Sequence, residues 1–339
     1  MRKTPLILSI CVLIIAASNW FGWQFYQFMQ TPLNVDSQGV VYDLLPGTGI
    51  RQVALQLHEQ GILEHPLWFV WLARYRNQAQ FIKAGEYKIL PGRLPGDLIT
   101  QFAEGRVMQH ELRLGEGWTL EEVLEAVETE PKLNHRLTSK EPADLIEQLE
   151  MEPQIPHPEG WFFPDTYHFP KGTTDIAFLK RAHELMQANL LQEWKQRAEG
   201  LPYKTPYEAL IMASIIERET GVTNEYAQVA GVYVRRLQQG MRLQADPTVI
   251  YGLGANYQEP LTRENLQTLT PYNTYMINGL PPTPIGLPSH SAIHAALHPA
   301  AGTSLYFVAT GEGGHYFSST LAEHNLAVNR YREWQQNNK

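Results

Sequence analysis

The stretch from Thr205 to Gly221, TPYEALIMASIIERETG, constrains the fold most strongly, because it predicts a single buried helix with both ends marked. Thr205 is placed to cap the amino end, with Pro206 at the first helical position and Glu208 completing a T-x-x-E capping box. Gly221 is the residue type that commonly closes a helix in the left-handed conformation. Large apolar residues cover most of the circumference in between, so we expect a largely buried helix.

Two carboxylates near the carboxyl end of this segment, Glu217 and Glu219, must occupy different environments. At about 100° per residue they point about 200° apart. Glu219 continues the apolar stripe of Met212, Ile215 and Ile216, whereas Glu217 faces the other way. A carboxyl at the end of a buried stripe, near the negative end of the helix dipole, should have a raised pKa, as a general acid near neutral pH requires. The alternative is that Glu219 pairs with an arginine and only closes the core.

The length of 339 residues suits two or three domains, and we expect an α+β fold. The predicted parts are a cytoplasmic amino terminus with a transmembrane anchor (1–30), a small subdomain with a linker helix (31–108) and a larger mixed α+β catalytic domain (109–339). Residues 130–158 are rich in Pro, Glu and Asn and are a candidate lid or interdomain region. The net charge of −8 argues against a nucleic-acid partner, which would require a basic face.

The first 30 residues predict a single membrane-spanning helix. A basic start is followed by an uncharged run that continues to about Phe28, close to the roughly 20 residues needed to span a bilayer. A cleaved signal peptide, with Ala16 and Ser18 before the cut, is the alternative; the aromatic cluster that begins at Trp20 favours a retained anchor. We therefore expect a plasma-membrane (inner-membrane) protein with its bulk outside the cytoplasm. The only cysteine, Cys11, lies in this segment, which excludes a disulfide and a thiol nucleophile.

Residues 40–90 predict a strand, two helices and a returning strand, with a further helix at 95–103. This order resembles a LysM module, the small fold that binds N-acetylglucosamine in cell-wall glycans. Direct glycan contact and a purely structural role both remain open for it.

Several polar or aromatic segments of the larger domain allow two interpretations. The aromatic patch at 160–169 could stack on sugar rings or belong to the core. Asp246 could cap a helix, with Pro247 at its first position, or contact substrate. His315, near a predicted hairpin turn, could be a surface residue or a ligand partner. The stiff proline-rich loop at 279–288 is suited to form an active-site wall.

Other chemistries lack their motifs, since the chain has no H-E-x-x-H, no G-x-S-x-G and no Walker loop. His290, His294 and His298 recur every four residues, which suggests a metal site. Pro288 and Pro299 flank them, however, and make one continuous helical face doubtful. We therefore predict no metal and no cofactor.

Ten segments in the same order resemble the endolytic murein transglycosylase family (MltG or YceG-like). They cover nearly the whole chain: the basic start with its anchor, the LysM-like unit, EGWFFPDTY (159–167), MASIIERET (212–220), RLQADPTVIYG (242–252), YNTY (272–275), GLPP (279–282), HP (298–299), YFVA (306–309) and GGHYF (313–317). The resemblance implies cleavage of the β-1,4 bond between N-acetylmuramic acid and N-acetylglucosamine inside nascent peptidoglycan strands. The product would be a 1,6-anhydro end, formed without water. Association with peptidoglycan synthases and a part in ending strand elongation are also implied.

A lytic transglycosylase can work with one carboxylate, because the C6 hydroxyl of the sugar is the nucleophile, whereas a glycoside hydrolase normally needs two. The resemblance places the acid at the second carboxylate of E-x-E-T, which is Glu219, and leaves Glu217 a structural or supporting role. It marks the remaining substrate-binding candidates less decisively: Gln244, Asp246, Asn273, Tyr275 and His315. Two rival functions stay open, a noncatalytic peptidoglycan-binding scaffold and a two-carboxylate muramidase that uses Glu219 and Asp246.

Overall fold

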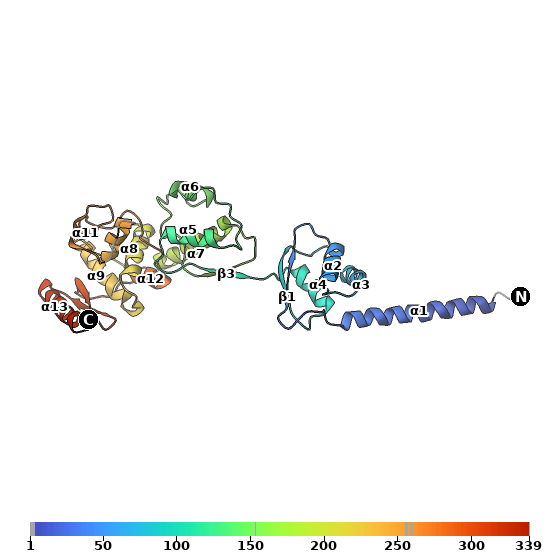
Figure 1. The fold of residues 1–339 in the computed structure, drawn as a ribbon. Helices are drawn as coiled ribbons and strands as arrows, with labels where there is room; N and C mark the ends of the chain where they lie inside the picture. The colour runs from blue at the N-terminus through green and yellow to red at the C-terminus, as the bar shows by residue number, and fades with distance from the viewer. Residues whose placement is uncertain (1–3, 153, 255–256, 258–259, 339) are drawn as a thin grey trace. The chain divides into compact units, whose positions relative to one another are not determined.

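The chain, in a computed structural model, divides into two compact units (Figure 1). The structure describes residues 4–152, 154–254, 257 and 260–338, with side chains from residue 9 onward. Unit 1 contains the residues up to His110 together with His168–Gly172, and unit 2 contains Glu111–Tyr167 and the residues from Thr173 onward. Helices and short two-stranded sheets are mixed along the chain, so the predicted α+β class is confirmed.

Unit 1 is built around one antiparallel strand pair, in which Val40 lies opposite Ile89 and Leu44 opposite Gly85. The predicted order of strand, two helices, strand and helix is confirmed. The elements are α1 (Thr4–Gln30), β1 (Val40–Leu44), α2 (Ile50–Glu59), α3 (Pro66–Tyr75), β2 (Gly85–Ile89) and α4 (Pro95–Glu104). Whether this unit is LysM-like stays a prediction.

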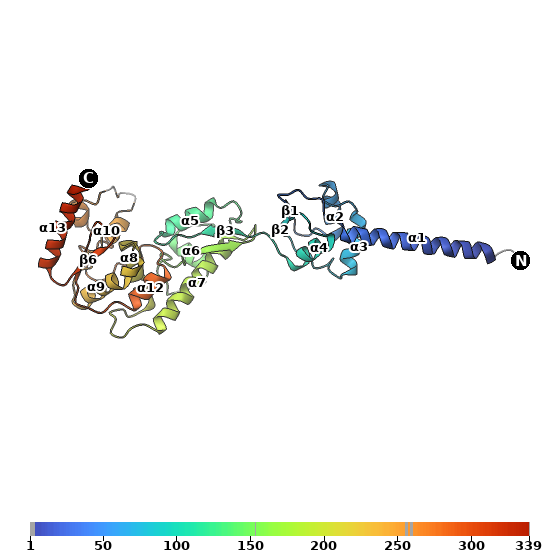
Figure 2. The same cartoon turned by 90° about the horizontal axis from the view of Figure 1, so that it is seen from below.

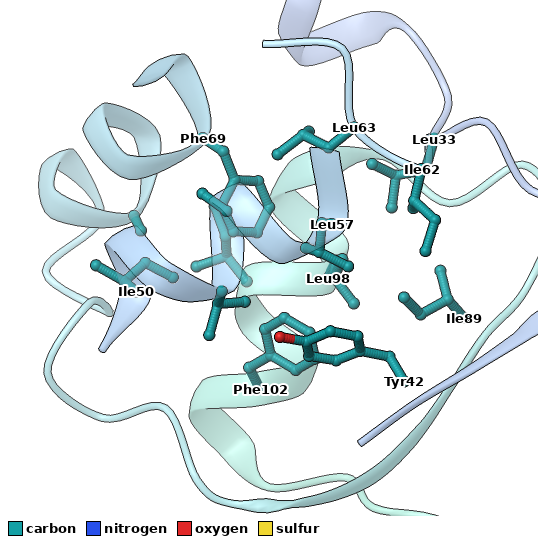
Figure 3. Close-up of a cluster of buried hydrophobic side chains, with 14 of the residues drawn as sticks. Leu33, Tyr42, Ile50, Leu57, Ile62, Leu63, Phe69, Ile89, Leu98 and Phe102 are labelled. Atoms are coloured by element: carbon teal, nitrogen blue, oxygen red, sulfur yellow. The ribbon is translucent and has the colours of Figure 1, made fainter. Parts of the chain in front are cut away.

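The core of unit 1 lies between this strand pair and its helices (Figure 3). Phe69 and Leu57 are fully buried, and the rings of Tyr42 and Phe102 lie 5.8 Å apart. Tyr42 keeps its hydroxyl paired by donating to Gln56 Oε1 at 2.6 Å. Burial raises the pKa of this tyrosine to about 12. Unit 1 therefore has a hydrophobic core of its own.

Helix α1 occupies the segment in which we predicted a membrane span. Over the described stretches of the chain, no helix is both long and apolar enough to cross a membrane. The predicted transmembrane helix within residues 1–30 is therefore not confirmed. Asn19, Gln24 and Gln27 lie in the described part of α1 and lower its mean hydropathy. The start of the predicted span, residues 1–3 and the side chains up to residue 8, lies outside the described residues.

Unit 2 is mainly helical and contains short strand pairs (Figure 2). One pair, at residues 110–113 and 166–169, includes His110, His168 and Phe169 of unit 1. β3 pairs with β4, and β5 pairs antiparallel with β6 so that Ala309 lies opposite His315. The elements are β3 (His110–Arg113), α5 (Leu120–Thr129), α6 (Pro142–Gln148), β4 (Thr166–Phe169), α7 (Asp175–Lys195), α8 (Pro206–Glu219), η1 (Thr223–Glu225), α9 (Tyr226–Gln238), α10 (Asp246–Leu253), α11 (Arg263–Gln267), α12 (His290–Leu297), β5 (Tyr306–Ala309), β6 (His315–Ser318) and α13 (Leu321–Asn337).

Helix α8 is the centre of unit 2, because it packs against α7, α9, α10 and α12. All its residues from Ala209 to Ile216 are buried, as predicted. Thr205 is the N-cap, and its Oγ1 accepts from Glu208 N at 3.2 Å. The predicted capping box is wrong, since the Glu208 carboxylate accepts from Lys204 N, one residue before the cap.

The carboxyl end of α8 also differs from the prediction. Thr220 leaves the helix in an extended conformation (φ −144°, ψ 138°), and its hydroxyl accepts from Val222 N. Gly221 is therefore not the left-handed closing residue. The abrupt exit leaves Glu219 as the last helical residue, at the edge of the buried core.

The proline-rich loop at 279–288 is attached to α8 by a buried hydrogen bond. Ser214 Oγ donates to Ile211 O at 2.7 Å and accepts from Ile285 N at 3.0 Å. Ile285 and Leu287 are fully buried. Gly286 passes so close to the neighbouring backbone that a Cβ would lie 2.6 Å from Gly117 O. The loop is a packed part of unit 2.

Candidate active site

The carboxyl end of α8 opens onto a pocket of about 370 Å³ within unit 2. α8, α9, β5, β6, α13 and the segment before α10 all contribute to its wall. The lining residues are Glu219, Tyr233, Arg236, Leu243, Gln244, Asp246, Tyr275, Tyr306, Phe307, Val308, Ala309, His315, Leu321 and His324. Five of the seven residues predicted for the site, Glu219, Gln244, Asp246, Tyr275 and His315, are thus brought together.

Glu219 keeps a substantial neutral fraction near pH 7, where an ordinary carboxyl is ionised. Burial, the largest cause, and the nearby Asp246 carboxylate raise the pKa of this carboxyl to about 7, although Tyr233 and Arg236 act to lower it. Oε2 of Glu219 and the Tyr233 hydroxyl are buried, and within the described part of the chain neither makes a hydrogen bond of regular geometry. The raised pKa expected from the helical position is therefore present, with desolvation as its main cause. No arginine forms an ion pair with Glu219 among the described residues, so the alternative of an Arg-paired core carboxylate is not supported.

Tyr275 and Asp246, which both line the pocket, form a polar pair. The Tyr275 hydroxyl donates to Asp246 Oδ1 at 2.6 Å, and burial raises the pKa of this tyrosine. Asp246 is exposed and is the first residue of α10, whose N-cap is Ala245, without a side-chain cap. The capping interpretation of Asp246 is therefore wrong, which leaves this carboxylate available to a ligand.

Arg236 is a buried cation that joins several parts of the wall. Its Nε donates to Leu305 O at 2.6 Å and its Nη1 to Leu243 O at 2.7 Å. The guanidinium lies 5.1 Å from the ring centre of Tyr306, and that ring stacks on His324. Burial, followed by the charge of Arg236, lowers the pKa of His324, so this imidazole is favoured in its neutral form.

The sequence reasoning missed Tyr233, Arg236, Tyr306 and His324. One local signal was present, since Tyr233 and Arg236 are three residues apart on the amphipathic α9 and therefore share a side. Nothing local connects them to Tyr306 and His324, which approach only through tertiary folding.

Gln244 and His315 both line the pocket, and each has a defined backbone conformation or backbone hydrogen bond. Gln244 adopts a left-handed conformation (φ 55°), which few residues other than glycine adopt, and its side chain is exposed. His315 Nδ1 lies 2.7 Å from Glu225 Oε2, and its backbone N–H donates to Glu225 Oε1 at 2.9 Å. Glu225 therefore sets the orientation of this imidazole, which supports the ligand interpretation of His315 over a free surface residue.

Glu217 and Asn273 do not line the pocket. Glu217 accepts from the Tyr226 hydroxyl at 3.0 Å and from Ser289 N at 2.8 Å, so it links α8, α9 and α12. Asn273 is fully buried; its Nδ2 donates to Thr268 O at 2.7 Å, among other carbonyl oxygens, and its Oδ1 accepts from the backbone of the YNTY segment. Both side chains are engaged with protein partners and have structural roles.

A second carboxyl with a raised pKa, Glu159, lies directly before the aromatic patch at 160–169. Burial raises its pKa to about 7, although Leu120 N and the Tyr251 hydroxyl donate to its two oxygens at 2.9 and 2.8 Å. It does not line the pocket. The patch itself supplies core residues, since Phe162 and Phe169 are buried, which favours its core interpretation.

The three histidines at a four-residue spacing do share one side, contrary to the prediction. Pro288 lies before the N-cap of α12, and Pro299 follows its C-cap, His298, so neither interrupts the helix. All three imidazoles approach the buried Glu193 of α7. Glu193, His294 and His298 place one possible ligand atom each within 4.8 Å of one another.

A carboxyl whose pKa is raised to about 7, at the wall of a polar pocket, defines a protein with the equipment for acid–base catalysis. The chain belongs to the YceG-like family, whose model matches residues 42–330.

Named relatives and a solved structure support this assignment. A Bacillus subtilis protein named endolytic murein transglycosylase is 28% identical over 316 residues, which cover 88% of this chain and 87% of the relative. A Streptococcus pneumoniae protein of the same name is 26% identical over 349 residues; the match covers 93% of this chain and 62% of the longer relative. A YceG-like protein of Listeria monocytogenes, solved by crystallography at 2.6 Å, is 30% identical with a TM-score of 0.52, over 86% of this chain and 99% of the other.

Proposed function

We propose that this chain is an endolytic lytic transglycosylase of peptidoglycan and that unit 2 is its catalytic domain. The observation that carries the proposal is the Glu219 carboxyl, whose pKa of about 7 keeps a proton available at the wall of an open pocket. The names of the B. subtilis and S. pneumoniae relatives supply the substrate, murein. The reaction needs no cofactor and no water.

The proposed reaction uses Glu219 twice. The neutral carboxyl first donates its proton to the glycosidic oxygen, so the bond from C1 of N-acetylmuramic acid to the O4 of N-acetylglucosamine breaks with a neutral leaving group. The resulting carboxylate then accepts the proton of the C6 hydroxyl, and O6 bonds to C1 to close the 1,6-anhydro ring. The proton balance returns Glu219 to its starting form, which explains how one carboxylate suffices.

The other polar residues of the pocket suit the charge changes of this reaction. Positive charge develops at C1 in an oxocarbenium-like transition state, and the exposed carboxylate of Asp246 faces the same pocket as Glu219. Tyr275 holds Asp246 in place by its hydrogen bond. Gln244 and His315, which also line the pocket, provide polar groups for the N-acetyl and hydroxyl groups of the glycan.

The decisive experiment compares Glu219→Gln with Glu217→Gln, two identical changes two residues apart on α8. Removal of a general acid typically costs about 10²–10⁴-fold in rate, so Glu219→Gln should stop the release of anhydromuramoyl ends from uncrosslinked glycan. Glu217→Gln keeps an oxygen for one of its two donors, Tyr226 and Ser289, and leaves the Glu219 acid in place, so it should retain that product. Mass spectrometry of the products, with circular dichroism to verify folding, provides the measurement.

Two other outcomes would favour the rival functions. If neither the parent protein nor the variants cleave glycan but all bind it, the chain is a scaffold. If the parent protein yields reducing ends that carry ¹⁸O from labelled water, Glu219 and Asp246 act as the two carboxylates of a muramidase; both line the same pocket, which is the observation in favour of that reaction.

We further propose that the enzyme acts on nascent strands beside peptidoglycan synthases and so helps to end strand elongation. The support is the family resemblance together with an endolytic reaction, which shortens a strand from within. Cells that carry only the Glu219→Gln protein should contain longer glycan strands. Chemical cross-linking in cells should recover a synthase with the chain, and recovery of none would remove this part of the proposal.

For unit 1 we propose direct contact with glycan. Tyr75 is 83% exposed, and Trp71 lies one turn before it on α3 and is half-exposed, so two aromatic rings are available to stack on sugars. Tyr75→Ala in the full chain should reduce co-sedimentation with insoluble peptidoglycan. Unchanged co-sedimentation would leave unit 1 a structural role only.

For α1 we propose attachment to the plasma membrane, with the rest of the chain outside the cytoplasm. A run of apolar side chains from Val12 to Ile15 is exposed on this helix. Leu13→Lys places a charge in that run and should move the protein from the membrane fraction to the soluble fraction. A parent protein that is itself soluble would overturn the attachment.

A further inference from the structure

A cluster of one carboxylate and three imidazoles lies where α7 and α12 of unit 2 pack together. Glu193, on α7, is only 6% exposed. His290 Nε2 lies 3.1 Å from its Oε1, whereas His294 Nδ1 lies 2.8 Å and His298 Nδ1 3.8 Å from its Oε2. The rings of His294 and His298 stack with centres 4.3 Å apart. None of these residues belongs to the pocket around Glu219.

We propose that Glu193, His294 and His298 form a structural binding site for a divalent transition cation of the zinc type. Imidazole nitrogen and carboxylate oxygen are the ligands that Zn²⁺ takes in proteins, at about 2.0–2.2 Å. In a tetrahedral site such ligand atoms lie roughly 3.4 Å apart. Two of the three separations, 2.8 and 3.8 Å from Glu193 Oε2, lie on either side of that value, and all three ligand atoms lie within 4.8 Å of one another, so side-chain rotation would bring them to an ion.

Neighbouring groups present the correct atoms to the ion. His298 Nε2 lies 2.8 Å from Gln196 O, and its Nδ1 lies 3.2 Å from His294 O. A neutral ring carries one proton, and the shorter contact favours Nε2 as its position, which leaves the lone pair of Nδ1 for the ion. His290 bonds Oε1 of Glu193 and thereby turns Oε2 toward His294 and His298. Such outer partners orient metal ligands in known sites.

The site is accessible as well as preorganised. The His294 side chain is 54% exposed and that of His298 29%, so an ion can enter from solvent, and water can fill the fourth position. Because the ligands come from α7 and from the end of α12, a bound ion would fix these helices together. α12 also packs against α8, so the ion would stabilise the scaffold behind Glu219 without contacting substrate.

The test uses the untagged full chain and Zn²⁺ alone, titrated by calorimetry. The parent protein should bind about one Zn²⁺ per chain. Removal of an outer partner costs about 10–100-fold in metal affinity, so His290→Ala should weaken binding about tenfold, and His294→Ala and His298→Ala, which remove ligands, by more than a hundredfold. His135→Ala, an exposed histidine elsewhere in unit 2, should bind like the parent protein.

A second measurement does not depend on variants that might misfold. A ligand that binds only the folded state raises the melting temperature, here by about 5 °C with Zn²⁺ at a hundredfold excess over its dissociation constant. Mg²⁺ should give no such shift, because it prefers oxygen ligands. Absence of Zn²⁺ binding by the parent protein at micromolar concentrations, or equal binding by folded His294→Ala and His298→Ala proteins, would overturn the proposal.

Discussion

At the scale of single residues, the balance of desolvation and charge around Glu219 sets its chemistry. Burial and Asp246 favour the neutral carboxyl, whereas Tyr233 and Arg236 favour the ionised one. The result is a pKa of about 7, so the proton can be both donated and recovered near neutral pH. Glu219 could be selected from the sequence because helical periodicity alone decides which carboxylate continues an apolar stripe. Tyr233 and Arg236 could not be assigned to it, because their approach depends on how α9 packs.

The pH dependence of the reaction follows from this balance. The neutral form of Glu219 is the acid, so the rate should fall as the pH rises through about 7. Tyr233→Phe removes a group that lowers the pKa of Glu219, and the falling limb should therefore move to higher pH. Rates of anhydromuramoyl release measured between pH 5 and 9 provide the test.

Glu159 is the control for this assignment, because its pKa is also raised to about 7 but it lies outside the pocket. Glu159→Gln should leave the falling limb where it is. If the fall in rate near pH 7 disappears in Glu159→Gln, the titrating group is not Glu219. The same conclusion follows if the pH of this fall does not change in Tyr233→Phe.

At the scale of elements, local sequence predicted where α8 starts but not how it ends. Thr205 and Pro206 were sufficient to predict the start of α8, because capping uses residues close in sequence. Its end could not be predicted, since Thr220 leaves the helix in an extended conformation. The environment of Glu217 also depends on a long-range contact, because its partner Ser289 is 72 residues away.

The contact between α8 and the proline-rich loop permits a stability test. Ser214→Ala removes the acceptor for Ile285 N and leaves this buried N–H unpaired, which should cost about 1–3 kcal/mol of unfolding free energy. Urea unfolding followed by tryptophan fluorescence measures the change. Ser291→Ala, at an exposed position of α12, should change stability by less than about 0.5 kcal/mol. Equal stability of both variants would mean that the loop does not depend on Ser214.

At the scale of the whole molecule, the chain forms two units, and the hydrophobic cluster of unit 1 contains no residue beyond Val107. The α+β class and the order of elements in unit 1 could be predicted from alternation and helical periodicity. The wall of the active-site pocket could not, because β5, β6 and α13 reach Glu219 from about 90 or more residues further along the chain. The histidine cluster was misjudged for a similar reason: its central carboxylate, Glu193, belongs to another helix.

Separate cores predict separate unfolding. Phe69→Ala opens a cavity in unit 1 and should destabilise that unit by about 3–5 kcal/mol. Calorimetry should then show one transition at lower temperature and a second, assigned to unit 2, that is unchanged. Alanine at Leu210, which is fully buried in α8, should produce the reverse pattern. A single transition that shifts as a whole in both variants would contradict independent units.

The short segment His168–Gly172 belongs to unit 1 although unit 2 precedes and follows it in sequence. Lys171 ties this segment to unit 1 through Asp43 at 2.5 Å and Glu86 at 3.5 Å. Unit 1 is therefore formed by two separate segments of the chain. After a single protease cut near residue 110, residues 168–172 of the carboxyl-terminal fragment would still be bound to the amino-terminal fragment. The two fragments should therefore elute together in size-exclusion chromatography until a denaturant separates them.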